Sequence, residues 1–324
     1  MFRAGGDDPH ACAIADVDAD GLGDVFCARG ARRGTIKKRN HLWMHVSART
    51  FVDRAWRYGV TDPFGRGRHA TFFNLNGDEY PDLFVGNEST RPNGLPTPNR
   101  TYLNAGGLRF QEVRIGATRE LGAECAVAAD TGGDARQDLL VCGNEGFHLF
   151  RNRSGPHGRR VLRDVAARYA MDLPDVTSAA VADLDLDGSN DVVLVQADRL
   201  TAFPGRPGGG FGPPRPLARL RAARWVTIGN FDGRRGVDLF VVQTCRAGRN
   251  VRDVALLDRG RGWSFDRSSW VPPADAGCGD LAASIDLDVD GADEVIVLNG
   301  MRGDPPNGGI SGPVQVLTIG PYPG

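Results

Sequence analysis

The chain has 324 residues, of which 41% are hydrophobic and 24% charged, and its formal net charge is −1. This apolar content excludes a disordered chain. No stretch approaches the ~20 apolar residues of a spanning helix, and the near-neutral charge argues against a dedicated nucleic-acid binder. The 44 glycines and 20 prolines are typical of a turn-rich chain, which indicates an all-β protein.

The first residues, Met1 to Asp8, contain no hydrophobic run and so do not resemble a signal peptide. Three interpretations fit this observation. The protein is cytosolic, or the sequence begins after a removed leader, or the chain is a domain of a longer protein.

An acidic nine-residue motif recurs along the chain. Its best copies begin at Asp16, Asp183 and Asp286 and share the pattern D-x-D-x-D-G-x-x-D/E. Weaker copies begin at Asn74, Asp130 and Asn230. The six copies are spaced by about 54 residues and account for residues 1–324 as one domain, which leaves no room for a seventh copy.

Short apolar runs surround every copy. One run precedes the acidic motif, as in 13–15, and a run rich in β-branched residues follows it, as in 191–195. Two further runs follow, such as 99–104 and 110–112. Four short strands per repeat predict a six-bladed β-propeller of four-stranded antiparallel blades. Only three strands are evident in the last repeat, and we expect residues near Phe2 to supply the fourth.

Each acidic motif is predicted to be a calcium loop between the first and second strands of its blade. Side-chain oxygens at positions 1, 3, 5 and 9, with the carbonyl at position 7, form the kind of oxygen set that Ca²⁺ prefers. Position 12, where an EF-hand needs glutamate, is Cys27, Leu194 or Val297. The alternative is a polar turn without an ion, but four carboxylates that repel one another need a cation.

The predicted ligands come from four loops. They are Asp16, Asp18, Asp20, Leu22 and Asp24; Asn74, Asn76, Asp78, Tyr80 and Asp82; Asp183, Asp185, Asp187, Ser189 and Asp191; and Asp286, Asp288, Asp290, Ala292 and Glu294. The three complete loops are expected to bind strongly and the Asn74 loop more weakly. The Asp130 loop lacks a ligand at Gly132, and we expect no ion there. We also expect no metal at the Asn230 loop, where Arg234 can pair with Asp232 or Asp238.

These loops resemble those of the FG-GAP/VCBS repeat family, to which the integrin α-subunit propeller belongs. The run 62–70, the Asn-x-x-Tyr segment at Asn99 and the Phe-x-Glu segment at Phe110 are most similar to the branch that contains cartilage acidic protein. The resemblance implies structural calcium and a secreted or cell-surface setting. The Phe-Gly and Gly-Ala-Pro words of the family are mostly absent, so kinship with integrins is architectural, and no adhesion motif is carried over.

The cysteines test the predicted hairpins. Cys12 and Cys27 flank the first loop, and Cys125 and Cys142 flank the third, at offsets with the same sum. Paired residues of an antiparallel hairpin have a constant index sum, so each couple is expected to form a disulfide. Cys245 and Cys278 are expected to form a third, with free buried cysteines as the alternative. Three disulfides favour an oxidising compartment and hence an extracellular protein.

Long connections on the face opposite the calcium loops are predicted to bind a partner. They carry the basic residues of Arg29–Arg39, together with Arg91, Arg246, Arg249 and Arg302. This pattern favours an acidic glycan or a protein as the partner, and a plain solvated surface is the alternative. We expect a monomer that does not insert into membranes.

No catalytic motif is present: the chain has no His-Glu-x-x-His, Gly-x-Ser-x-Gly or phosphate-binding loop. The sequence therefore favours a non-catalytic, calcium-binding, extracellular scaffold for binding or adhesion. Two alternatives stay open, a polysaccharide lyase or hydrolase on the same propeller and a purely structural module of a larger protein.

Overall fold

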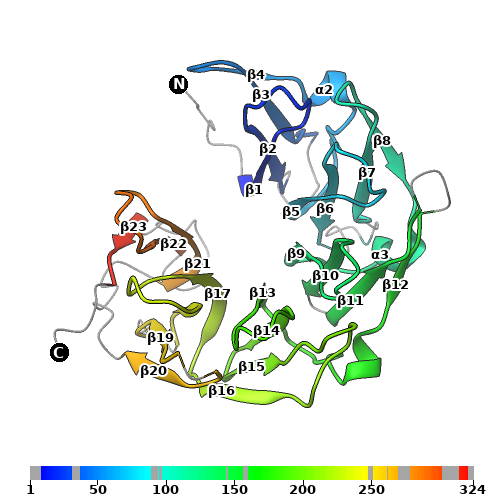
Figure 1. Ribbon diagram of the computed structural model, residues 1–324. Coiled ribbons are helices and arrows are strands. Elements are labelled where there is room, and N and C mark those ends of the chain that lie inside the picture. The colour runs from blue at the N-terminus through cyan, green and yellow to red at the C-terminus, as the bar shows by residue number, and fades with distance from the viewer. Residues whose placement is uncertain are drawn as a thin grey trace. The chain divides into compact units, whose positions relative to one another are not determined.

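The protein is a six-bladed all-β propeller, as the repeat predicts. The computed structural model describes residues 9–30, 37–88, 94, 97–143, 145–155, 160–246, 251–260, 262–268, 278–300 and 314–319. These residues form two compact units, 1–175 and 176–324, with three sheets in each. Figure 1 shows the sheets in chain order, blue to green in the first unit and green to red in the second.

The first unit holds three four-stranded antiparallel sheets. Their strands are β1 (Pro9–Ala15), β2 (Asp24–Arg29), β3 (His41–Ser47) and β4 (Thr50–Asp53); β5 (Gly67–Phe73), β6 (Asp82–Asn87), β7 (Arg100–Asn104) and β8 (Phe110–Val113); and β9 (Cys125–Ala129), β10 (Asp138–Gly143), β11 (Gly146–Asn152) and β12 (Leu162–Asp164). One-turn helices α2 (Ala55–Tyr58) and α3 (Gly116–Arg119), and the 3-10 turn η1 (Ala166–Tyr169), follow the fourth strands.

The second unit holds two four-stranded sheets and one of three strands. Their strands are β13 (Ser178–Ala182), β14 (Asp191–Gln196), β15 (Arg199–Phe203) and β16 (Arg215–Arg219); β17 (Ala223–Gly229), β18 (Asp238–Gln243), β19 (Val254–Asp258) and β20 (Phe265–Ser268); and β21 (Cys278–Ile285), β22 (Glu294–Gly300) and β23 (Val314–Leu317). The four strands predicted for the sixth blade are thus three among the described residues. Phe2, which we expected to lie in the fourth, is outside them.

Apolar side chains fill the space between neighbouring blades within each unit. Phe26 and Met44 of the first blade share a cluster with Leu83 and Tyr102 of the second, and all four are nearly inaccessible to solvent. In the second unit Phe231 and Phe240 pack against Val295 and Val297 of the last sheet. Each such side chain contributes roughly 1.5–3 kcal/mol when fully buried. The blades therefore stabilise one another through the faces that a single blade leaves open.

The hairpin register confirms the predicted disulfides. Cys12 lies directly opposite Cys27 between β1 and β2, and Cys125 lies opposite Cys142 between β9 and β10. The third bridge joins Cys245, just after β18, to Cys278 at the start of β21. All six cysteines are therefore paired, and the alternative of free buried thiols is wrong.

Among the described residues, no helix has the length and apolar character needed to cross a membrane.

Candidate metal loops

All six acidic loops lie between the first and second strands of their sheets, and in each the carboxylate at position 9 accepts the N–H of position 2. Asp24 starts β2, and its Oδ2 accepts the Val17 N–H at 2.9 Å, while Oδ1 accepts the His45 N–H of β3 at 2.8 Å. The equivalent carboxylates and the residues whose N–H they accept are Asp82 with Leu75 and Asn104, Asp138 with Thr131 and Asn152, Asp191 with Leu184 and Gly205, Asp238 with Phe231 and Asp258, and Glu294 with Leu287. In the first five blades position 9 thus also joins the loop to the third strand or to the residues just after it, a role that the spacing of the motif did not predict.

The backbone of every loop turns through a left-handed residue at position 4. In the three weaker loops this residue is glycine: Gly77, Gly133 and Gly233. In the three complete loops it is Ala19 at φ 58°, Leu186 at φ 59° and Val289 at φ 62°. A β-branched residue such as Val289 rarely adopts this conformation, which costs about 1–2 kcal/mol. The loops with the most carboxylates are therefore also the most strained.

Carboxylates converge in the three complete loops. In each of the sets Asp16, Asp18 and Asp24; Asp183, Asp185 and Asp191; and Asp286, Asp288 and Asp290, one oxygen per residue lies within 4.8 Å of the others. Position 1 is held by the backbone: the two oxygens of Asp183 accept the N–H groups of Asp187 and Gly188 at 3.0 and 2.8 Å. Position 5 accepts the N–H of position 7, where Leu22, Ser189 and Ala292 were predicted as ligands through their carbonyls.

Two of the three position-3 carboxylates in the complete loops, those of Asp18 and Asp185, have a buried oxygen without a partner among the described residues, whereas Asp288 is exposed. Oδ1 of Asp18 and Oδ1 of Asp185 are both inaccessible to solvent and accept no hydrogen bond among the described residues. Burial and the neighbouring Asp20 and Asp16 raise the pKa of Asp18. Burial also raises the pKa of Asp191 to about 6, with Asp185 and Asp183 adding to the effect. A buried anionic oxygen with no donor costs free energy, and a hard cation with six to eight oxygen ligands removes that cost.

The three weaker loops satisfy their carboxylates from within the protein. In the second loop the Asn76 amide donates to Asp78 Oδ2 at 2.6 Å, and the Asn74 amide donates to the Asp78 carbonyl. In the fifth loop Arg234 Nε lies 3.7 Å from Asp232 Oδ2, which confirms the predicted pairing with Asp232 rather than with Asp238. In the third loop Arg151 Nη1 lies 2.8 Å from Asp138 Oδ2.

The hairpin between the third and fourth strands of one blade covers the acidic loop of the blade before it. In the first unit, a Cβ added to Gly107, which follows β7, would lie 2.9 Å from the Asp18 Cα. In the second unit, Trp263, which precedes β20, donates its indole N–H to Asp185 Oδ2 at 2.5 Å. Asn104 and Asn152 extend the pattern, because their amides donate to the position-2 carbonyls of Val17 and Leu75 at 2.8 and 3.0 Å.

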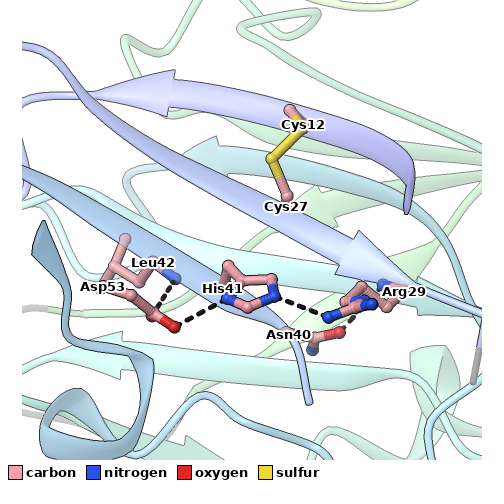
Figure 2. Close-up of a disulfide and its surroundings, with 7 residues drawn as sticks. All are labelled: Cys12, Cys27, Arg29, Asn40, His41, Leu42 and Asp53. Atoms are coloured by element: carbon pink, nitrogen blue, oxygen red, sulfur yellow. Dashed lines mark hydrogen bonds and ion pairs between the residues drawn. A yellow bond between two sulfur atoms is a disulfide. The ribbon is translucent and has the colours of Figure 1, made fainter. Parts of the chain in front are cut away.

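Only part of the predicted basic face lies among the described residues. Lys37, Arg39 and Arg246 are exposed, whereas Arg91, Arg249, Arg302 and residues 31–36 lie outside the described residues. Arg29 does not belong to an open surface: it ends β2, is 5% exposed, and its Nη1 lies 2.6 Å from His41 Nε2. Figure 2 shows this contact continuing from His41 Nδ1 to Asp53 Oδ2, at 2.7 Å, along the edge of the first blade. Arg29 is covered because both faces of β2 are buried near its end, which its place at the start of a long connection did not indicate.

Comparisons with known proteins point to one set of relatives by sequence. No protein-family model matches the chain. The chain is similar to cartilage acidic protein 1. It is 27% identical to the mouse protein over 293 residues and 25% identical to the human protein over 291, in each case over 85% of this chain. The aligned part is 41% of the mouse and 40% of the human protein, so the chain spans about two-fifths of the length of these relatives.

Solved structures share the fold at lower identity. An Agrocybe aegerita lectin that recognises non-reducing terminal N-acetylglucosamine matches with a TM-score of 0.60 and 17% identity, over 96% of this chain and 81% of the lectin. The PQQ-bound aldose sugar dehydrogenase of Streptomyces coelicolor matches with a TM-score of 0.50 and 15% identity, over 96% and 94% of the two chains. One neighbour binds a sugar and the other is an oxidoreductase, so the fold alone does not decide the function.

Proposed function

We propose that this chain is a calcium-stabilised, extracellular β-propeller that serves as a non-catalytic scaffold for binding a glycan or a protein. The observation that carries the calcium assignment is the pair of buried oxygens, on Asp18 and Asp185, that have no hydrogen-bond partner among the residues that the structure describes. Each belongs to a set of three converging carboxylates. The loops at Asp16, Asp183 and Asp286 are proposed as the strong sites and the Asn74 loop as a weaker one.

The ion would be structural. It would neutralise carboxylates that otherwise repel one another, and it would offset the strain of the left-handed residue at position 4. The residues that would hold it at the fourth loop are Asp183, Asp185, Asp187 and Asp191, with the Ser189 carbonyl. The chemistry that Ca²⁺ supplies is charge compensation and coordination of oxygen.

Thermal unfolding in calcium and in chelator tests this assignment. We expect EDTA to lower the melting temperature by roughly 5 °C or more. Calcium that binds only the native state increases the free energy of unfolding, and the chelator removes that contribution. Magnesium in excess should restore little of the loss, because it demands a tighter octahedral site. An unchanged melting temperature in EDTA would count against structural calcium.

The extracellular assignment is supported by the three disulfides, which persist in oxidising compartments. Expression in the cytosol and in an oxidising compartment tests it. We expect a protein with three bridges and a single unfolding transition only from the oxidising compartment. Equal stability with all six thiols free would contradict the assignment.

The proposed partner surfaces are the basic connections between second and third strands, taken in each unit by itself. The described members are Lys37 and Arg39 in the first unit and Arg246 in the second. Uronic-acid and sulfated saccharides are the anionic partners that such a surface fits. An array of acidic and neutral glycans tests this proposal. We expect acidic glycans to bind intact and to lose affinity in Arg39→Glu and Arg246→Glu, whereas depolymerisation of a glycan would favour the lyase or hydrolase alternative.

A further inference from the structure

Beside the third acidic loop, β11 carries a buried arginine where four other blades have an apolar residue. The residue before the one that donates its N–H to the position-9 carboxylate is Met44, Leu103, Pro204 or Leu257 in the first, second, fourth and fifth blades. In the third blade it is Arg151, whose side chain is 7% exposed. Burying a charged arginine costs free energy, so its presence at one of five equivalent positions needs an explanation in the surroundings of that residue.

A change within the third acidic loop itself, at position 3, supplies that reason. Position 3 is aspartate or asparagine in the five other loops and glycine only at Gly132. A Cβ at Gly132 would overlap Nη1 of Arg151, so the guanidinium fills the space that a position-3 side chain would need. The loss of the position-3 carboxylate at Gly132 and the gain of the Arg151 guanidinium are therefore linked, because the two side chains would occupy the same space.

Every carboxylate of the third loop has donors from the protein. Asp138 Oδ2 accepts from Arg151 at 2.8 Å and from the Thr131 hydroxyl at 2.6 Å. Asp134 pairs with Arg153 at 3.3 Å, and Asp130 accepts N–H groups from Gly133 and Ala135 at 2.7 Å each. Among the described residues, no oxygen of these three carboxylates is both buried and unpaired, in contrast to Asp18 and Asp185.

We propose that the guanidinium of Arg151 takes the place of the metal ion in the third loop, so that this loop closes without calcium. The inference rests on the proposed calcium sites of the other loops. It extends that proposal, because it assigns the loop's cation to a side chain of the next hairpin, on β11. Because the arginine cannot dissociate, the β9–β10 hairpin stays closed whatever the calcium concentration.

Charge at position 151 is the first thing to test. In EDTA, Arg151→Gln is expected to lower the melting temperature by roughly 5 °C or more, since it leaves the buried Asp138 without its cation. Arg151→Lys should recover most of the loss. The matched control is Arg153→Gln, which removes a pair whose arginine is 57% exposed and should shift the melting temperature by no more than about 1 °C. Equal shifts for Arg151→Gln and Arg153→Gln, or no recovery with lysine, would overturn the inference.

The converse test builds a metal site. The double variant Gly132→Asp, Arg151→Met gives the third loop an aspartate at position 3 and the methionine of the first blade. We expect it to bind one calcium ion more than the wild type, counted by isothermal titration with CaCl₂, and to regain its melting temperature in calcium. An unchanged count in a folded double variant would overturn the inference. A wild type that binds no calcium would instead refute the proposed function, and the EDTA measurements on Arg151 would still decide the role of the arginine.

Discussion

Asp253, just before β19, is a buried acid at a place where two other blades have asparagine. Its Oδ1 accepts the Gln243 N–H at 2.7 Å, as Asn40 and Asn99 accept the N–H groups of Arg29 and Asn87. The Asn99 amide also donates to the Thr118 carbonyl at 2.8 Å, whereas Asp253 Oδ2 is buried and has no partner in the described part of the chain. Burial raises the pKa of Asp253 to about 7.

Asp253→Asn is therefore expected to stabilise the protein at alkaline pH. A carboxyl whose pKa is higher in the native state than in the unfolded chain destabilises the fold above that pKa. The cost is full above pH 7 and shrinks as the pH falls toward 3.8. We expect a gain on the order of 2–4 kcal/mol at pH 8 and a clearly smaller gain at pH 5, measured by urea unfolding in saturating calcium.

Asp280→Asn is the control for this prediction, because Asp280 is an exposed member of an ion pair with Arg224. Its effect on the free energy of unfolding should be small and should not grow with pH. A gain for Asp253→Asn that is equal at pH 5 and pH 8 would show that the carboxyl does not titrate in this range.

At the scale of elements, the first, second and fourth acidic loops each depend on two blades of one unit. The loop is formed by the first two strands of its own sheet, and the end of the third strand of the next sheet, or the hairpin after it, lies over the loop. Gly107 illustrates the contact, since its φ of 74° and its approach to Asp18 both require glycine. The adjacent Gly106 has a φ of 66° but nothing within 4 Å of an added Cβ.

Substitutions at Gly106 and Gly107 can separate the cost of a left-handed backbone from the cost of a steric contact with the first loop. Gly106→Ala is expected to cost about 1–2 kcal/mol, which is the penalty for a left-handed alanine. Gly107→Ala should cost more and should also weaken calcium binding at the first loop, because its Cβ would push against the backbone of Asp18. Unfolding and calcium titration of both variants measure this difference. Equal calcium affinity in the two variants would contradict a role for the hairpin in holding the loop.

The elements themselves were largely predictable from sequence. The period of the acidic motif predicted six hairpins. The positions of Cys12 and Cys27 on either side of the first loop predicted the register of the first hairpin. The burial of Arg29 did not follow from alternation within its strand, because both faces of β2 are buried near its end. Arg151 was not predictable in the same way, since it lies 19 residues beyond Gly132 on another strand, and only the shared hydrogen bond at position 9 aligns it with Met44, Leu103 and Leu257.

At the scale of the whole molecule, the blades differ in what keeps their loops closed. The first, fourth and sixth loops have converging carboxylates. The second, third and fifth have amides or arginines in their place. The overall architecture followed from the sequence because strand count and repeat length are local properties. How charge is balanced in each loop did not, because it depends on side chains contributed by a neighbouring strand or blade.

Calcium counting under equilibrium conditions decides whether the acidic loops hold structural ions. The chelator-treated chain is titrated with CaCl₂ in a calorimeter, and the bound ions are then counted by elemental analysis. We predict three tightly bound ions per chain, with a fourth at the Asn74 loop at higher calcium concentration, and two tight ions in Asp185→Asn. A chain that retains no calcium, or an Asp185→Asn variant with an unchanged count, would contradict the account.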